Sequence, residues 1–201
     1  MQEIKGIKIE EDSSVYEPSD DSFLAMKAID LLANTTKDKK FEILDVGTGT
    51  GLLGIYAANR LNAGRLVLVD INEHAVALAK KNSKINRGLL RCEIEIIKSD
   101  LFEKVAGTFD LIIFNAPYLR GNYSEKQPII ERAWNGGANG IEVSERFMQE
   151  ARSRLKENGT IILTASSFGN LKKLEKKIKE LGYKIKMILK EHYFFEDIIA
   201  I

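Results

Sequence analysis

The feature that most constrains the fold of this chain is a regular alternation between short apolar runs and amphipathic helical patterns. The run Leu111–Phe114 is uninterrupted, as expected for a parallel strand that is buried on both faces. By contrast, Leu171, Leu174 and Ile178 recur at the spacing of one helical stripe. This alternation predicts an α/β fold with a doubly wound, mostly parallel sheet and helices on both faces.

We expect seven strands and five helices from these patterns. The predicted strands are Phe41–Asp45, Arg65–Asp70, Glu93–Lys98, Phe109–Phe114, Gly159–Thr164, Lys184–Lys190 and Tyr193–Ile201. The predicted helices are one that begins at Asp20 or Asp21 and ends before Asn34, then Leu52–Leu61, Asn72–Lys84, Glu142–Lys156 and Asn170–Leu181. Only Glu191-His192 separates the last two strands, which predicts a C-terminal hairpin and hence an antiparallel strand.

The bulk composition limits the class of protein. A chain of 201 residues with 44% hydrophobic and 29% charged residues is ordinary for one soluble domain. The formal net charge of +1 gives no bulk attraction to nucleic acid or to a membrane. The sequence has no apolar run near the ~20 residues that span a bilayer, no signal-peptide pattern and one cysteine, Cys92. We therefore expect a cytoplasmic protein.

A glycine turn follows the first predicted strand of the sheet. Residues 45–51 read D-V-G-T-G-T-G, so Gly47, Gly49 and Gly51 let the backbone turn sharply and approach a ligand. A dinucleotide site would read G-x-G-x-x-G, whereas here the third glycine comes one residue earlier. The carboxylate of Asp45 would repel a diphosphate but suits a ligand that carries an ammonium group.

Two further carboxylates follow the next two strands. Asp70 ends one strand and suits the two hydroxyls of a ribose, and Asp100, beside Leu101, suits an adenine amino group. With Asp45 they describe a site for a cationic adenosine, which S-adenosylmethionine fits. The alternative is that each aspartate only caps a helix or a loop. That reading suits one aspartate alone better than three in register with the glycine turn.

The fourth strand ends abruptly at residues 115–118. Pro117 has no N–H and cannot continue the hydrogen bonds of a central strand. The strand end therefore presents the Asn115 amide, backbone carbonyls and the Tyr118 ring at the edge where open α/β sheets bind ligands. We predict that Asn115, Ala116, Pro117 and Tyr118 form the catalytic stretch, with Asn115 also beside the cofactor.

These segments resemble a known family. Residues 45–51, Asp70, Asp100 and 115–118 are similar to the motifs of class I S-adenosylmethionine-dependent methyltransferases that carry Asn-Pro-Pro-Tyr. Residues 15–23 (V-Y-E-P-S-D-D-S-F) and 133–140 (A-W-N-G-G-A-N-G) resemble the HemK-type release-factor glutamine methyltransferases, in their short archaeal and eukaryotic branch. The resemblance runs from about residue 15 nearly to the end, and it implies a Rossmann-like fold and S-adenosyl-L-methionine as cofactor.

The resemblance also implies an organisation for the chain. Residues 1–201 would form a single methyltransferase domain, in which residues 1–34 close the cofactor site and Tyr16 and Ser22 help to cover the cofactor. Trp134 would shape the acceptor pocket; the alternative is a core aromatic. A small zinc-binding activator subunit is implied as a partner, with its predicted contact at Leu89-Leu90 and the adjoining strand.

The implied reaction is methylation of the side-chain amide of glutamine in the Gly-Gly-Gln loop of a translation termination factor. The Asn115 oxygen and the Ala116 carbonyl can accept the two amide hydrogens, while Tyr118 packs against the flat amide. Ala116 stands where the family has its first proline. The carbonyl is kept and the rigid φ is lost, so we expect a functional but looser site.

Other functions stay open from the residues alone. An adenine amine has the same planar donor pattern as a glutamine amide, so residues 115–118 also suit an adenine-N6 methyltransferase acting on RNA or DNA. The balanced charge disfavours that reading mildly. A non-catalytic adenosine-binding module is the third possibility. His74 and His192 stand in no metal-ligand pattern, so no metal site is expected.

Overall fold

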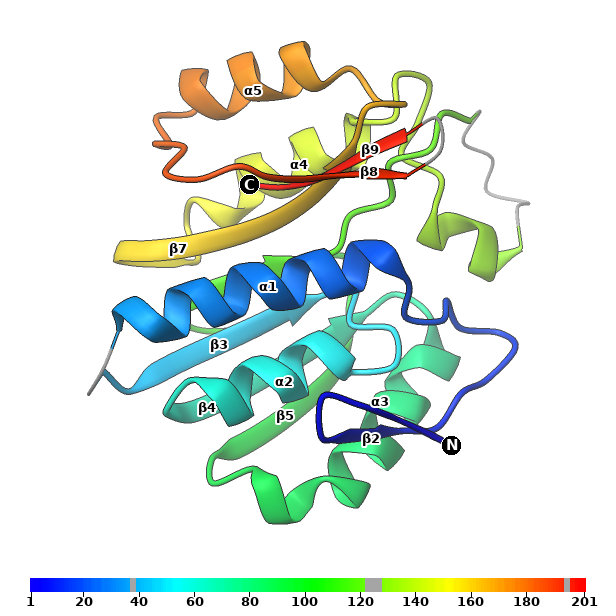
Figure 1. Cartoon of the computed structure of the whole chain (residues 1–201), viewed down its shortest axis with the longest axis vertical. Helices are drawn as coiled ribbons and strands as arrows, with labels where there is room; N and C mark the ends of the chain where they lie inside the picture. Colours follow the sequence, from blue (N-terminus) through cyan, green and yellow to red (C-terminus); the bar gives the residue numbers. More distant parts are fainter. Residues whose placement is uncertain (37–38, 122–127, 194–195) are drawn as a thin grey trace.

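The computed structural model describes residues 1–36, 39–121, 128–193 and 196–201. Its centre is a seven-stranded sheet in the order β5-β4-β3-β6-β7-β9-β8 (Figure 1). The strands from β5 to β7 are parallel, whereas β9 runs antiparallel to both neighbours. The predicted fold is therefore confirmed. The strands are β3 (Phe41–Val46), β4 (Ala63–Asp70), β5 (Glu93–Lys98), β6 (Phe109–Phe114), β7 (Leu155–Ser166), β8 (Leu189–Tyr193) and β9 (Glu196–Ala200).

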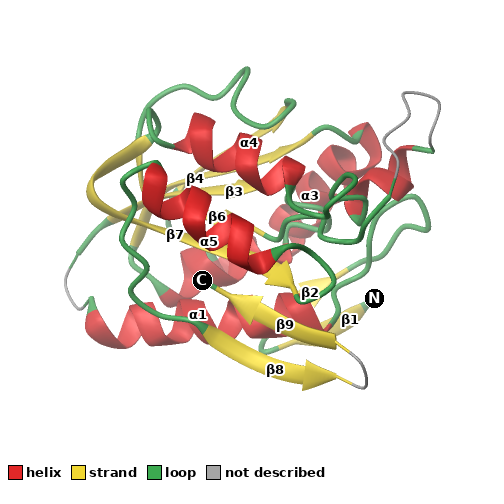
Figure 2. Cartoon of the chain, turned by 90° about the horizontal axis from the view of Figure 1, so that it is seen from above, coloured by secondary structure: helices red, strands yellow, loops and turns green. Residues whose placement is uncertain are grey.

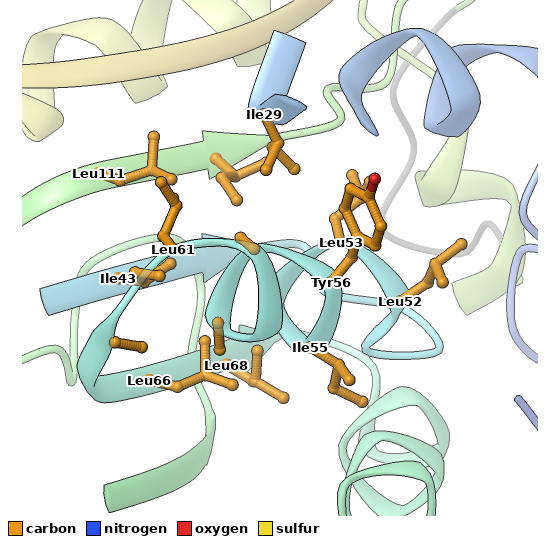
Figure 3. Close-up of a cluster of buried hydrophobic side chains, with 14 of the residues drawn as sticks. Ile29, Ile43, Leu52, Leu53, Ile55, Tyr56, Leu61, Leu66, Leu68 and Leu111 are labelled. Carbon is orange, nitrogen blue, oxygen red and sulfur yellow. The ribbon is translucent and has the colours of Figure 1, made fainter. Parts of the chain in front are cut away.

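Helices cover both faces of this sheet (Figure 2). One apolar cluster joins α1, α2 and α3 to one face through side chains such as Tyr56 and Leu68 (Figure 3). The other cluster joins α4 and α5 to the opposite face, where the Phe147 ring lies 4.6 Å from that of Phe114. The helices are α1 (Asp20–Thr35), α2 (Leu52–Arg60), α3 (Glu73–Ile85), α4 (Glu142–Ala151) and α5 (Leu171–Glu180), with short 3-10 helices η1 (Arg87–Leu89) and η2 (Ile129–Ala133).

The C-terminal third departs from the prediction at several places. The helix predicted over Glu142–Lys156 ends at Ala151, and β7 begins at Leu155 rather than Gly159. Residues 156–159 form an irregularity inside β7, where the register against β6 shifts and Asn158 adopts a φ of +61°. The regular apolar pattern therefore begins only after them. The predicted turn Glu191-His192 is also wrong, because both residues pair with β9 inside β8.

The predicted strand Lys184–Lys190 is mostly absent, because its apolar residues pack against a helix-covered face of the sheet instead. The pattern over Lys184–Lys190 alternates like a strand, yet residues 183–188 lie outside any strand. Tyr183 and Ile185 instead pack against the second apolar cluster, and the Tyr183 hydroxyl donates to the Met148 carbonyl at 2.9 Å. Tertiary packing therefore uses the apolar residues that suggested a strand.

A short N-terminal hairpin was not predicted. It pairs β1 (Gln2–Ile4) with β2 (Ile7–Ile9) through Lys5 and Gly6, which both have positive φ. Ile7 and Ile9 are fully buried in the cluster that covers the α2 face. Strands of three residues are too short for a periodic signal, and Lys-Gly is a weaker turn signal than Asn-Gly.

Candidate active site

A cavity of about 240 Å³ lies at the carboxyl ends of β3, β4 and β6. This is the edge at which open α/β sheets bind ligands. The cavity brings together most of the predicted site residues: Tyr16, Ser22, Asp45, Gly47, Gly49, Asp70, Asp100, Leu101, Asn115 and Pro117. Gly51, Ala116 and Tyr118 are not among its lining residues.

The glycine turn follows β3 as predicted, and its three glycines have different surroundings. Gly47 has a φ of +61°, and a Cβ there would lie 3.1 Å from the Phe114 ring. A Cβ on Gly51 would instead lie 3.4 Å from Ala79 of α3. Gly51 therefore allows α2 and α3 to pack closely, whereas Gly47 and Gly49 form the cavity wall.

The Asp45 carboxylate is buried at the base of the turn. Its Oδ2 accepts hydrogen bonds from the Thr48 hydroxyl at 2.6 Å and from the Gly54 N–H at 2.9 Å. Burial raises the pKa of Asp45 to about 7, against the lowering effect of these two donors, and the nearby Asp70 adds to the increase. A cationic group in the cavity would favour the ionised form of this carboxyl.

Both oxygens of Asp70 are held by the backbone. Oδ1 accepts from the Asn72 N–H at 2.8 Å, and Oδ2 accepts from the Gly49 N–H at 2.9 Å. Burial raises the pKa of Asp70 although these donors oppose the increase. Because each carboxylate oxygen can accept more than one hydrogen bond, this fixed carboxylate can still receive two hydroxyls of a ligand.

Asp100 has a partner that the sequence did not suggest. Its Oδ2 lies 3.0 Å from the Arg146 guanidinium of α4, and Arg146 also lines the cavity. Burial opposes the charged guanidinium, yet hydrogen bonds to Asp100 and Glu150 raise the pKa of Arg146 overall. An amino group that approached Asp100 would therefore share it with an arginine.

The stretch 115–118 is fixed by contacts from distant segments. The Thr164 hydroxyl of β7 donates to Asn115 Oδ1, and the Tyr118 hydroxyl donates to Asp21 of α1 at 3.2 Å. Burial raises the pKa of the Tyr118 hydroxyl, and neighbouring charges that include Asp21 raise it further, so this hydroxyl stays a donor at neutral pH. Ala116 is buried in the apolar cluster of the α4 face.

Asp21 also connects this stretch to the N-terminal segment. Its Oδ2 accepts from the Tyr16 hydroxyl at 3.4 Å as well as from Tyr118, and its Oδ1 accepts from the Ser22 N–H at 2.6 Å. Asp21 is almost fully buried. The sequence suggested Asp21 only as a possible first residue of a helix, since nothing local indicates the contact with Tyr118.

Asparagines of α3 and of its N- and C-caps hold the N-terminal segment on the molecule. Asn86 accepts from the Lys8 N–H at 2.9 Å and donates to the Lys8 carbonyl at 2.7 Å. Asn82 accepts from the Glu10 N–H at 2.9 Å and donates to the Glu10 carbonyl at 3.1 Å. Asn72 donates to the Ser14 carbonyl at 2.8 Å. Two amides one helical turn apart thus act as a strand partner for the segment that leads to the cavity.

The connection between β6 and α4 contributes to the cavity through its described part. The 3-10 helix η2 supplies four lining residues, Ile129, Ile130, Arg132 and Ala133. Trp134 is 37% exposed and is neither a core aromatic nor a lining residue. A Cβ on Gly136 would lie 2.6 Å from the Pro117 carbonyl, so this glycine allows the chain's own backbone to approach closely. Residues 122–127 lie outside the described residues.

The described residues contain neither a membrane-spanning helix nor a metal-binding cluster. No helix there combines the length and the apolar character that crossing a bilayer requires. Their His, Cys, Asp and Glu side chains form no group of three or more that could hold a metal ion.

The fold is Rossmann-like, with the cavity at the carboxyl ends of its parallel strands. The solved Mtq2–Trm112 complex of E. cuniculi, which is responsible for the methylation of the eRF1 translation termination factor, has this fold. It matches with a TM-score of 0.67 and 22% identity, over 93% of this chain and 96% of the other.

The methyltransferase small domain family matches residues 25–194, and the chain belongs to this family. A putative protein N5-glutamine methyltransferase of Methanocaldococcus jannaschii is 39% identical over 200 residues, which cover 99% of this chain and 96% of the relative. Methyltransferase HEMK2 of Mus musculus is 31% identical over 170 residues, which cover 84% and 79%. The predicted resemblance to glutamine methyltransferases is confirmed, and with it the class of enzyme.

Proposed function

We propose that this chain methylates the side-chain amide nitrogen of a glutamine in the Gly-Gly-Gln loop of a translation termination factor, with S-adenosyl-L-methionine as donor. The observation that carries the proposal is the position of Asn115, on the cavity wall at the end of a buried strand. A nearly full-length relative named as a glutamine methyltransferase supports the choice of acceptor. The proposal includes a single domain over residues 1–201 and a cytoplasmic location.

The cofactor fits the donor set of the cavity. When bound, it supplies a methyl carbon whose bond to a sulfonium sulfur breaks as the bond to the acceptor nitrogen forms, and the nitrogen loses one proton to water after the transfer. The cofactor's ammonium would be a cationic partner for Asp45. It would favour the ionised form of this carboxyl, whose pKa is raised by burial. Asp70 would accept from the ribose hydroxyls. We assign cofactor binding to Tyr16, Ser22, Asp45, Gly47, Gly49, Asp70, Asp100, Leu101 and Asn115, and a supporting role to Gly51.

Residues 115–118 would promote the reaction by positioning the amide nitrogen of the acceptor glutamine. An amide nitrogen is a poor nucleophile because its lone pair is delocalised into the carbonyl. The Asn115 oxygen and the Ala116 carbonyl would accept its two hydrogens, which aims the nitrogen and stabilises the positive charge that develops on it. The Tyr118 ring, whose hydroxyl is held by Asp21, would support the amide plane. Orientation of this kind supplies roughly 7–11 kcal/mol in favourable cases.

A small zinc-binding activator subunit is part of the proposal, and β5 is its proposed contact. This strand is an edge of the sheet and is only partly buried, so it can pair with a strand of another chain. Leu89 is 41% exposed, whereas Leu90 is 3% exposed and belongs to the core. Leu89→Asp should therefore abolish co-purification of the activator, and Leu31→Asp, at an exposed position of α1, should not. Equal recovery with both variants would place the contact elsewhere.

Transfer of labelled methyl from S-adenosyl-L-methionine tests the function. We expect label on the cognate termination factor, lost when its loop glutamine is replaced and lost with Asn115→Ala. Asn34→Ala, an exposed position of α1, is the matched control and should keep full transfer. Label on adenine of RNA or DNA, with none on protein, would replace this proposal by the adenine-N6 reading. Cofactor binding without transfer to either acceptor would favour the non-catalytic module.

A further inference from the structure

We infer that Thr164 is a positioning residue for Asn115, an inference that rests on the proposed function. The parallel register pairs Phe114 of β6 with Leu163 of β7. The next residue of each chain segment is then Asn115 and Thr164, and residues in register on neighbouring parallel strands point to the same face. The structure places the Thr164 hydroxyl as donor to Asn115 Oδ1.

The burial of Thr164 makes this contact more than a surface hydrogen bond. Its side chain is fully buried, and its neighbours Leu163 and Ala165 belong to the apolar core. A buried hydroxyl without a partner is destabilising, so a polar residue here requires an acceptor, and the acceptor is the amide at the cavity wall. Valine has nearly the same shape and would fill the position without that requirement.

The hydrogen bond from Thr164 restricts rotation of the Asn115 side-chain amide, which the backbone conformation does not determine. Rotation of the terminal amide of an asparagine is broad and roughly two-fold. A donor on Oδ1 restricts that rotation and keeps the oxygen, rather than the NH₂ group, in one direction. Because the oxygen has two lone pairs, it can accept from Thr164 and from an acceptor amide hydrogen together. A rotated amide would point N–H groups at the N–H groups of the glutamine.

Paired substitutions test this role by kinetics. With Thr164→Val we expect kcat to fall about tenfold to a hundredfold, since a small misplacement of a positioned group has effects of this order. The dissociation constant of S-adenosyl-L-methionine and the melting temperature should stay near wild type. Thr164→Ser should restore most of kcat, and Thr160→Val, the same change on the same strand away from the cavity, should leave kcat unchanged. Wild-type kcat in Thr164→Val, or a folded Thr164→Ser as slow as Thr164→Val, would overturn the inference.

A spectroscopic measurement separates this inference from the proposed function. In protein labelled with ¹⁵N-asparagine, the side-chain NH₂ signals of Asn115 are identified by their loss in Asn115→Ala. We expect these signals to shift in Thr164→Val and to stay in place in Thr164→Ser and Thr160→Val. If the wild type methylates no protein glutamine, the proposed function fails and these signals still decide the contact. Unchanged Asn115 signals in Thr164→Val would refute the inference whatever the acceptor.

Discussion

On the β3–β4 side of the cavity, backbone N–H groups hold Asp70 and hold Asp45 together with the Thr48 hydroxyl, whereas on the β6–β7 side other side chains hold Asn115 and Tyr118. Asp70 is fixed by the N–H groups of Gly49 and Asn72. Asn115 is fixed by the Thr164 hydroxyl, and Tyr118 by Asp21. Backbone donors survive most substitutions, but side-chain donors do not. The cofactor side should therefore tolerate changes around it, while the acceptor side should respond to residues that never touch a ligand.

The largest effect should come from removing a charge on the cofactor side. Asp45→Asn keeps the shape and the acceptor oxygen but loses the carboxylate that would face the cofactor's ammonium. A charge-assisted hydrogen bond is worth about 1.5–3 kcal/mol, so we expect the affinity for S-adenosyl-L-methionine to fall about tenfold to a hundredfold. Isothermal titration calorimetry measures it, with Thr160→Val as the unaffected control. Unchanged affinity would remove Asp45 from the proposed cofactor site.

A second substitution tests the N-terminal segment, which is held by side chains although it borders the cofactor side. Asn86→Ala leaves the N–H and carbonyl of Lys8 without this partner. We expect the free energy of unfolding in urea to fall by about 1–3 kcal/mol. Hydrogen exchange at the Lys8 amide should become faster, and Asn34→Ala should change neither quantity. Slow exchange at Lys8 in the variant would mean that the segment does not depend on Asn86.

The pH dependence of cofactor affinity should be smaller but has a definite sign. Burial raises the pKa of the Asp45 carboxyl from 3.8 to about 7 in the free protein, so a cation must displace a proton below that pH. Affinity should fall about tenfold for each pH unit below 7. In the free protein this carboxyl favours the folded state less as pH rises from 3.8 to about 7, because the folded state binds its proton more tightly. A flat affinity between pH 6 and 8 would contradict the raised pKa.

The smallest effect is expected at the position where the chain departs from the family motif. Ala116→Pro should raise the free energy of unfolding by about 0.4–1 kcal/mol if the native φ suits proline, because it restricts the unfolded chain. The Ala116 carbonyl remains, so methyl transfer should stay close to wild type. Thermal unfolding and the transfer assay check the two parts. A lower melting temperature would show that the backbone at Ala116 does not suit proline.

Features that depend on local sequence pattern, namely strand bounds and the side chains at strand ends, could be predicted from the sequence. The β5 and β6 bounds were predicted to the residue, and the carboxylates Asp45 and Asp70 line the cavity as expected. Periodicity and strand-end position carry this information without knowledge of the neighbouring elements.

What the sequence did not reveal are contacts between segments far apart in the chain. Asp21 and Tyr118 are 97 residues apart, and Asn115 and Thr164 are 49 apart. A threonine in a strand and an aspartate at a helix start are ordinary in their local settings. Arg146 likewise gave no signal, because only the packing of α4 brings it to Asp100.

The way in which Asn82 and Asn86 hold β2 and the residue after it has a consequence for divergence between relatives. Both amides bind main-chain atoms of Lys8 and Glu10, so these hydrogen bonds do not depend on which side chains stand at the two positions. Substitutions at Lys8 should accumulate freely, since its side chain is exposed. A change of either asparagine would leave main-chain groups of this segment without their partner, although Ile7 and Ile9 stay packed in the core. Variation should therefore be unequal across this contact, wide at Lys8 and narrow at Asn82 and Asn86.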